Sequence, residues 1–232
     1  MFLKNAAGVG EAIGATVTGH LRITETIFMN EVLDVLPTRD VALLSRINKD
    51  SSHAWSMISE LTLPDDFNED VGNLRLPIQL RELTFGRSFN QRLDDFNFPD
   101  GLVRLVFQGS DVEYCNFNQS IDRVTFPQAL KVLAIGSHFN QQIHNVTWPL
   151  TLRELSFGLD FNQPMDEVTL PNSLERLAFG YDFQQRLQHL VLPICLRSLS
   201  LHPVYSHSIG DLRPNVVIRR SSCPRPWARS RW

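Results

Sequence analysis

The sequence is poor in cysteine and contains no long apolar run. Its three cysteines, Cys115, Cys195 and Cys223, lie far apart and form no C-x-x-C pair. An odd number of scattered cysteines argues against a disulfide framework and favours a reducing compartment. No run of about 18 apolar residues is present, so no membrane span is expected. Because Glu11 also interrupts the small-residue stretch near the start, we expect no signal peptide and a cytoplasmic or nuclear protein.

The sequence also lacks the motifs that carry common chemistry. It has no glycine-rich phosphate loop, no His-Glu-x-x-His and no Gly-x-Ser-x-Gly. No set of acid, base and nucleophile converges on one segment. We therefore expect a protein that is not an enzyme, with no catalytic residue, no cofactor and no metal.

The positive charge is concentrated at the C-terminal end, although the net charge is −3. Residues 214–232 hold five of the 22 basic side chains and none of the 25 acidic ones. The remaining residues are acidic overall and bind phosphate poorly. We therefore expect no nucleic-acid partner except for weak contact through the tail, and a disordered tail is the simpler expectation.

A repeat of 22 residues organises the middle of the chain. An apolar–proline pair marks each unit, and one interval between these prolines is 28 residues rather than 22. The prolines are Pro77, Pro99, Pro127, Pro149, Pro171 and Pro193. After each proline comes Leu-x-x-Leu-x-apolar, and in most units glycine and Phe-Asn-Gln follow. The longer interval indicates a loop around residues 110–116.

Each unit is too short to bury its own apolar side chains, so neighbouring units must stack. The Leu-x-x-Leu-x-Phe run predicts a strand, and residues such as 146–148 predict a second short strand that proline ends. The glycine suggests a turn with an unusual φ. We therefore expect a mainly β repeat solenoid, leucine-rich-repeat-like with 22-residue coils, over residues 55–213. It would contain about seven coils.

An amide recurs at one position of the coil. The ladder consists of Asn68, Asn90, Asn118, Asn140 and Asn162, and Gln184 follows. The structural interpretation is a buried amide that satisfies backbone groups of the turns and of neighbouring coils. A polar binding stripe is the functional alternative.

The outward positions of the predicted strands form a candidate binding strip. These are Glu82, Thr84, Arg104, Val106, Val132, Ala134, Glu154, Ser156, Arg176, Ala178, Ser198 and Ser200. The first position of each strand alternates in charge and the second is small, which suits an extended protein partner better than a pocket. Small residues tolerated on a crowded sheet are an equally good explanation.

Three titratable residues, His138, Asp160 and Asp182, share the coil position before the core phenylalanine. Consecutive coils would stack them about 5 Å apart, the spacing of strands in a sheet. A histidine beside two carboxylates could bind a metal ion. Ordinary exposed turn residues are the simpler expectation.

The repeat positions resemble the FNIP repeat, a relative of the leucine-rich repeat named for its Phe-Asn core. The resemblance rests on the Pro, Leu-x-x-Leu-x-Phe-Gly and Phe-Asn-Gln positions of about five consecutive units. It implies a solenoid fold that binds proteins on one face.

Residues 21–54 lack the repeat and show a helical period, with Pro37 ending one helix and Thr38 suited to start the next. Leu36-Pro37, Asp40-Val41, Leu43-Leu44-Ser45 and Ile47-Asn48-Lys49 resemble an F-box. That resemblance implies a Skp-type adaptor contact through Leu36, Pro37, Val41, Leu44 and Ile47. A plain helical cap on the open end of the solenoid is the alternative.

The expected organisation is therefore a disordered N-terminus (1–20), an F-box-like helical segment (21–54), an FNIP-repeat solenoid (55–213) and a basic, disordered tail (214–232). The two resemblances together imply a non-enzymatic substrate-recognition subunit of a cullin-RING ubiquitin ligase. The alternative is an FNIP-repeat scaffold that binds a protein and has no ubiquitin link.

Overall fold

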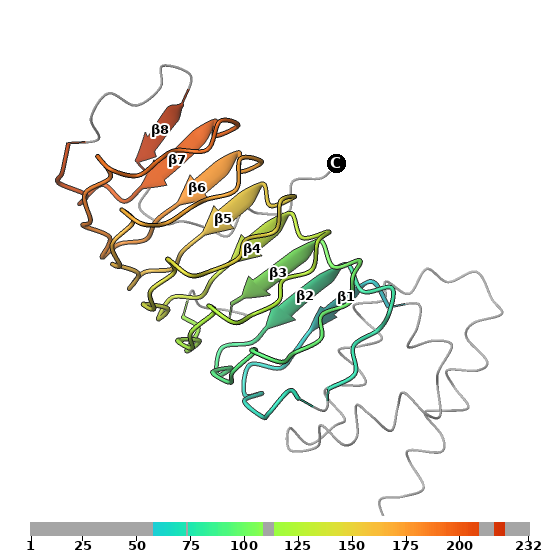
Figure 1. Ribbon diagram of the computed structural model, residues 1–232. Helices are drawn as coiled ribbons and strands as arrows, with labels where there is room; N and C mark the ends of the chain where they lie inside the picture. Colours follow the sequence, from blue (N-terminus) through green and yellow to red (C-terminus); the bar gives the residue numbers. More distant parts are fainter. Residues whose placement is uncertain (1–57, 73, 109–113, 209–215, 221–232) are drawn as a thin grey trace, which may run out of the picture. The chain divides into compact units, whose positions relative to one another are not determined.

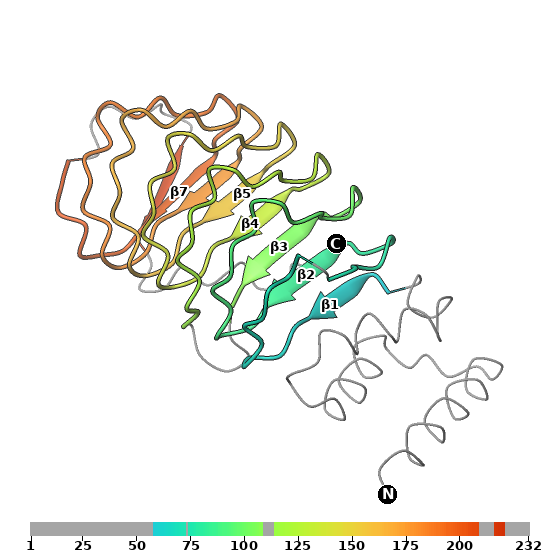
Figure 2. The same ribbon diagram turned by 60° about the horizontal axis from the view of Figure 1, so that its bottom comes forward.

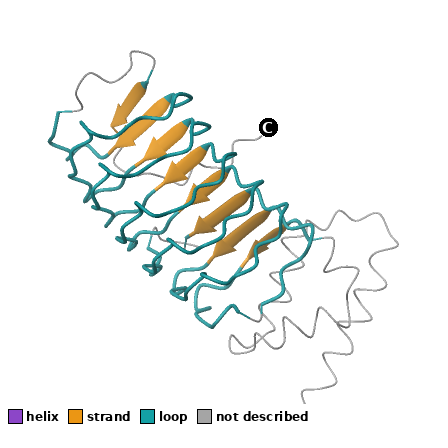
Figure 3. Cartoon of the chain, in the orientation of Figure 1, coloured by secondary structure: helices purple, strands orange, loops and turns teal. Residues whose placement is uncertain are grey.

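The computed structural model describes residues 58–72, 74–108, 114–208 and 216–220. In this part of the chain eight strands form one sheet, in which each strand lies next to its neighbour in sequence (Figure 1). The strands are β1 (Glu60–Thr62), β2 (Glu82–Phe85), β3 (Arg104–Phe107), β4 (Val132–Ala134), β5 (Glu154–Ser156), β6 (Arg176–Ala178), β7 (Ser198–Leu201) and β8 (Val217–Arg220). Every neighbouring pair is parallel. The described residues contain strands and loops but no helix (Figure 3), and thus no helix that could cross a membrane.

The register of the sheet follows the sequence repeat. Leu83 of β2 pairs with Leu105 of β3, one 22-residue unit later, and Leu105 pairs with Leu133 across the longer unit. The chain therefore makes one turn of a coil between consecutive strands, and the return segments lie on the other side of the coils from the sheet (Figure 2). The predicted parallel β-solenoid of about seven coils is confirmed.

Two columns of mostly aromatic side chains run through the interior of the coils, beside buried leucines. The first contains Phe67, Phe89, Phe117, Phe139, Phe161, Phe183 and Tyr205. Successive rings of this column are stacked, with centroids 6.0 to 6.1 Å apart. The second column contains Phe85, Phe107, Ile135, Phe157 and Phe179. Offset stacking adds about 0.5–1.5 kcal/mol per pair beyond the burial of the rings.

Tyr205 shows that the aromatic column extends one coil beyond the last Phe-Asn or Phe-Gln pair. Its ring stacks on Phe183, and its hydroxyl donates to the backbone oxygen of Gln185 at 3.0 Å. Ser206 takes the next position and donates its backbone N–H to Gln184. The coil is therefore complete although its sequence no longer carries the Phe-Asn signature.

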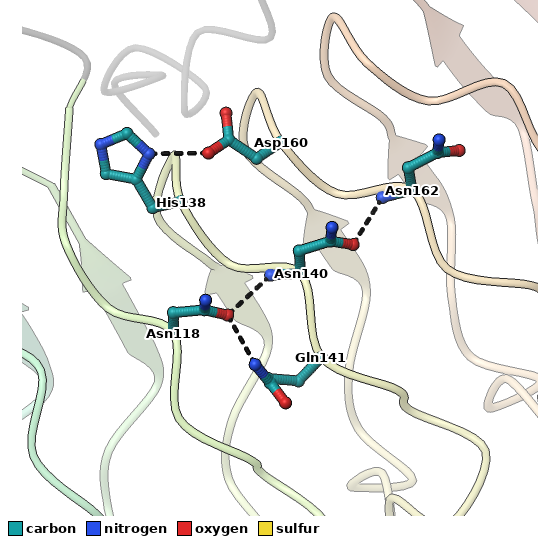
Figure 4. Close-up of polar contacts among 6 residues, drawn as sticks. All are labelled: Asn118, His138, Asn140, Gln141, Asp160 and Asn162. Atoms are coloured by element: carbon teal, nitrogen blue, oxygen red, sulfur yellow. Dashed lines mark hydrogen bonds and ion pairs between the residues drawn. The ribbon is translucent and has the colours of Figure 1, made fainter.

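The asparagine ladder joins the coils through side-chain bonds. Each asparagine Oδ1 accepts the backbone N–H of the equivalent residue in the next coil at 2.8 to 3.0 Å. The same oxygen accepts a bond from the following glutamine, as Asn118 does from Gln141 (Figure 4). Asn68 and Asn118 are exposed and the other three asparagines are only half-buried, so the expectation of a buried amide is wrong. The ladder satisfies backbone donors along the surface of the solenoid.

The glycine after the strand is required by a close approach of backbones. A Cβ built on Gly158 would overlap the carbonyl oxygen of Gly136 in the preceding coil, and one on Gly180 would overlap that of Gly158. None of the described glycines has a left-handed φ, so the predicted reason for these glycines is wrong. Gly at this position lets consecutive turns pack backbone against backbone.

The segment before each proline forms no second strand. Residues 146–148 lie outside every strand, and so do their equivalents 124–126 and 168–170. Turns bend the chain on either side, because Val146 N–H bonds to the oxygen of Ile143 and Leu152 N–H to that of Pro149. The stacked prolines also lack the N–H that a ladder between coils would need.

Strand β8 lies inside the segment 214–232, where the sequence indicated no regular structure. Val217 N–H bonds to the oxygen of Arg197 at 2.8 Å, and Ile218 pairs with Leu199. All four residues of β8 are exposed. Arg220 stands where the other coils place a core side chain, and its guanidinium donates to the backbone oxygens of Pro203 and Tyr205 at 3.4 Å.

The predicted helical segment 21–54, the disordered N-terminus 1–20 and the rest of the basic tail lie outside the described residues. So does most of the predicted loop insertion. After this segment the chain returns to the regular coil at Cys115 and Asn116. The backbone N–H of Asn116 donates to the backbone oxygen of Arg87, and that of His138 donates to the backbone oxygen of Cys115.

Candidate functional site

The sheet register aligns the strip residues in two rows. Glu82, Arg104, Val132, Glu154, Arg176 and Ser198 form the first strand row, and Thr84, Val106, Ala134, Ser156, Ala178 and Ser200 form the second. Both rows alternate along each strand with fully buried leucines such as Leu83 and Leu155, so their side chains point away from the core. The structure thus brings all the predicted strip residues together.

Opposite charges of the first strand row pair between coils. Arg104 lies 4.0 Å from Glu82, and Arg176 forms an ion pair with Glu154. Burial of the guanidinium, followed by the charges of Arg197 and Arg219, lowers the pKa of Arg176. Arg197 and Arg219 thus lie near enough to Arg176 for their charges to act on it.

The second strand row is largely buried. Val106, Ala134, Ser156, Ala178 and Ser200 each expose 6% of their surface or less, whereas Thr84 is half-buried. The sequence suggested that these small residues leave room for a partner. In the structure, a partner would meet the longer side chains around this row before it reached the row itself.

A third row, which the sequence analysis missed, borders the strands. It consists of the residue immediately before each of the strands β2 to β7, and we call it the edge row. Its members are Arg81, Val103, Lys131, Arg153, Glu175 and Arg197. From Val103 onwards, each backbone N–H of this row bonds to the oxygen of the preceding member at 2.8 to 2.9 Å. The sequence could have revealed this row, because its members all stand between the first leucine of the repeat and the predicted strand.

The edge row is basic and exposed. Arg153 and Arg197 expose 58% and 77% of their side chains, and Arg81 and Lys131 are also exposed. Glu175 is the single acidic member, 3.0 Å from Arg153 and 3.9 Å from Arg197. Within the described residues, Lys131 forms no ion pair.

The opposite ends of the strands carry the histidine and aspartates that the sequence placed at one coil position. Backbone bonds put His138, Asp160 and Asp182 in register, and His138 Nδ1 lies 2.7 Å from Asp160 Oδ2 (Figure 4). Both side chains of that pair are about two-fifths exposed (42% and 40%). Among the described residues, no three His, Cys, Asp or Glu side chains gather as a metal ion would need.

Cys115 lies beneath this end of the strands and is buried, whereas Cys195 is exposed. Burial raises the pKa of the Cys115 thiol, which therefore stays protonated at neutral pH. A protonated, buried thiol is a packing group and not a nucleophile. The five predicted adaptor residues, Leu36, Pro37, Val41, Leu44 and Ile47, lie outside the described residues.

Comparison with known proteins agrees with this architecture. A crystal structure described as that of CroV588, with a novel circular LRR protein structure, is 33% identical to the chain with a TM-score of 0.54. The similarity covers 70% of this chain but only 26% of that one. None of the curated proteins that were compared matches the chain.

The family described as FNIP Repeat matches residues 67–110, 117–160 and 161–203. The gap between the first two matches contains the loop insertion of the longer unit, and the matched segments together span more than half of the 232 residues. They begin at Phe67 and include the stacked phenylalanines, the asparagine ladder and strands β2 to β7. The chain belongs to the FNIP repeat family.

Proposed function

We propose that this chain is a non-catalytic binding protein that recognises a protein partner with the outward side of its sheet. The observation that carries the proposal is the alignment of the two strand rows and the edge row across consecutive coils. Repeat solenoids use such continuous surfaces to bind extended partners. The varied charge of the first strand row and the edge row supplies specificity, since each coil presents a different side chain at an equivalent position.

Site-directed photo-crosslinking in the full chain tests this proposal. A photoreactive amino acid at Glu82 or Val132 places the probe on the first strand row, and one at Val191, which is 79% exposed, places it on the return side. Mass spectrometry then identifies what each position captures in cells. The proposal predicts one protein captured from both strand-row positions and absent at Val191. Equal capture at all three positions would contradict it.

We further propose that residues 21–54 dock a Skp-type adaptor, which would make the chain the substrate-recognition subunit of a cullin-RING ubiquitin ligase in the cytoplasm or nucleus. The support is the resemblance of residues 36–49 to an F-box. The FNIP matches begin only at residue 67, so they support the binding surface and not this role. If the predicted helices of this segment only cap the solenoid, the chain is a binding scaffold with no ubiquitin link.

Co-expression with the adaptor distinguishes these two roles. The ligase role predicts that the full chain co-elutes with the adaptor in size-exclusion chromatography and that a variant lacking residues 20–50 does not. Circular dichroism must show that the shortened chain keeps its β-rich solenoid. A folded full-length chain that elutes without the adaptor would leave the scaffold role.

A further inference from the structure

The edge row carries positive charge that its own surroundings do not neutralise. Four of its six members are cationic, and Glu175 is its only carboxylate. Glu175 exposes 20% of its side chain and is shared by two arginines, so both guanidinium groups keep much of their surface in solvent. An exposed row of like charges is self-repelling and gains from an anionic partner.

The spacing of the edge row suits an extended chain. Backbone bonds join its members from coil to coil, so successive side chains lie about one strand spacing, ~4.8 Å, apart. Five such steps separate Arg81 from Arg197, a span of about 24 Å. An extended peptide of about eight residues covers this span at ~3.3 Å per residue.

Positive charge is denser at the end of the strands where the edge row lies, although Arg87 follows β2 at the other end. The residues that follow the strands include Asp65, Asp160 and Asp182, so the opposite border of the sheet is richer in acids. A partner with acidic groups is therefore drawn to the edge row and repelled from the other border. This asymmetry fixes which side of the sheet an acidic segment would follow.

A protein segment fits the edge row better than a nucleic acid. Glu175 within the row and Glu82 and Glu154 beside it would repel a continuous line of phosphates, whereas carboxylates at chosen positions of a peptide can avoid them. Among the described residues the exposed aromatic side chains are Tyr114 and Tyr181, and both follow the strands. The edge row thus lacks the stacking platforms that single-stranded nucleic acids use.

We propose that the edge row binds an acidic, extended segment of the protein partner, which runs along the sheet from coil to coil and pairs with Arg81, Lys131, Arg153 and Arg197. This inference rests on the proposed binding function and adds the chemistry of the partner. The segment would carry carboxylates every two or three residues and would leave Glu175 opposite an uncharged side chain.

Fluorescence anisotropy of the full chain with a labelled 12-residue peptide of alternating glutamate and serine tests the inference. The test variant combines Lys131→Gln, Arg153→Gln and Arg197→Gln. The control variant combines Arg92→Gln, Arg123→Gln and Arg186→Gln, which are exposed residues of the return side. Both variants lose three positive charges, and circular dichroism and thermal melting check that both are folded.

The test variant should bind the acidic peptide about tenfold more weakly than the wild type, the loss expected for three exposed ion pairs of ordinary strength. The control variant should stay within about twofold of the wild type. A glutamine–serine peptide should bind neither variant nor the wild type. Raising the salt from about 50 to about 500 mM should weaken wild-type binding, because the Debye length falls.

Three results would overturn the inference. The first is that the acidic peptide does not bind the wild type. The second is that the control variant loses as much affinity for the peptide as the test variant does. The third is that a 12-residue oligothymidylate binds the wild type more tightly than the peptide does. The last result would indicate a nucleic acid on the same row. If the partner found by crosslinking binds the test variant and the wild type equally, the acidic-segment inference fails while the proposed function stands.

Discussion

The interior columns and the outer rows of the coils follow opposite rules. In the interior, almost every coil repeats the same side chain, and Phe139, Phe161 and Phe183 stack with no change of residue. In the outer rows the residue changes from coil to coil, as from Arg153 to Glu175 and back to Arg197. The repeated positions hold consecutive coils together, whereas the varied positions are free to determine what the solenoid binds.

The largest expected effect breaks an interior column. Phe161→Ala removes a ring that contacts Phe139, Phe157, Phe179 and Phe183, and it should lower the free energy of unfolding by about 3–5 kcal/mol. Urea denaturation followed by circular dichroism measures this change. Phe98→Ala is the matched control, because Phe98 is only half-buried and should cost less than half as much. Equal losses would mean that the column is not the main support of the stack.

The next effect concerns the close packing of backbones. Gly158→Ala should destabilise the chain by about 1–3 kcal/mol, because the new Cβ overlaps backbone atoms of Gly136 and Ser137 that cannot move aside. Gly101→Ala is the control, since its Cβ would meet the movable end of the Arg81 side chain at 3.1 Å. The same denaturation experiment compares them, and a Gly101 variant as unstable as the Gly158 variant would contradict this explanation.

A smaller effect sharpens the role of the asparagine ladder. Asn140→Leu removes the Oδ1 that accepts the backbone N–H of Asn162 and the amide of Gln163. The Gln163 amide keeps its bond to the Asn140 backbone oxygen, but the Asn162 N–H loses its acceptor, which should cost about 1–3 kcal/mol. Gln141→Ala removes only one donor to Asn118, which still accepts from Asn140, and should cost about 1 kcal/mol or less. Thermal melting of both variants measures the difference, and the reverse order would indicate that the ladder does not satisfy the backbone.

The smallest change in stability is expected in the outer rows. Lys131→Gln, Arg153→Gln and Arg197→Gln together should change the free energy of unfolding by about 0.5 kcal/mol or less, because exposed ion pairs contribute little. The same triple variant should bind the acidic peptide more weakly than the wild type. It should therefore lose affinity while keeping its stability. A large loss of stability would mean that the edge row is structural and would remove the contrast between interior and outer positions.

The sequence predicted the parts of the fold that depend on repeated residues. Stacking of equivalent positions follows from the period alone, so the sequence places Asn118, Asn140 and Asn162 in one ladder, as the structure confirms. The strip residues likewise fell into rows because strands of a solenoid pair in register. A period determines which residues are neighbours, and the neighbours determine most of the interior.

Features that depend on distance between backbones were not readable from the sequence. The role of Gly158 is visible only from the position of the Gly136 carbonyl, and β8 pairs with β7 at an interval of 19 residues rather than 22. Arg219 and Arg220 read as part of a charged tail, although they belong to a strand. The direct 2.7 Å contact between His138 Nδ1 and Asp160 Oδ2 depends on side-chain rotamers that a shared coil position does not determine.

The most direct test of the account measures the affinity of the crosslinked partner for two single variants. Val132→Arg introduces a long charged side chain at the centre of the first strand row, and Val191→Arg introduces it on the return side, where Val191 is 79% exposed. Isothermal titration calorimetry of the full chain should show at least a tenfold loss of affinity for Val132→Arg and none for Val191→Arg, since a misplaced charge costs more than 1.4 kcal/mol in a close interface. Equal affinity of both variants, each folded, would contradict a binding surface on the sheet.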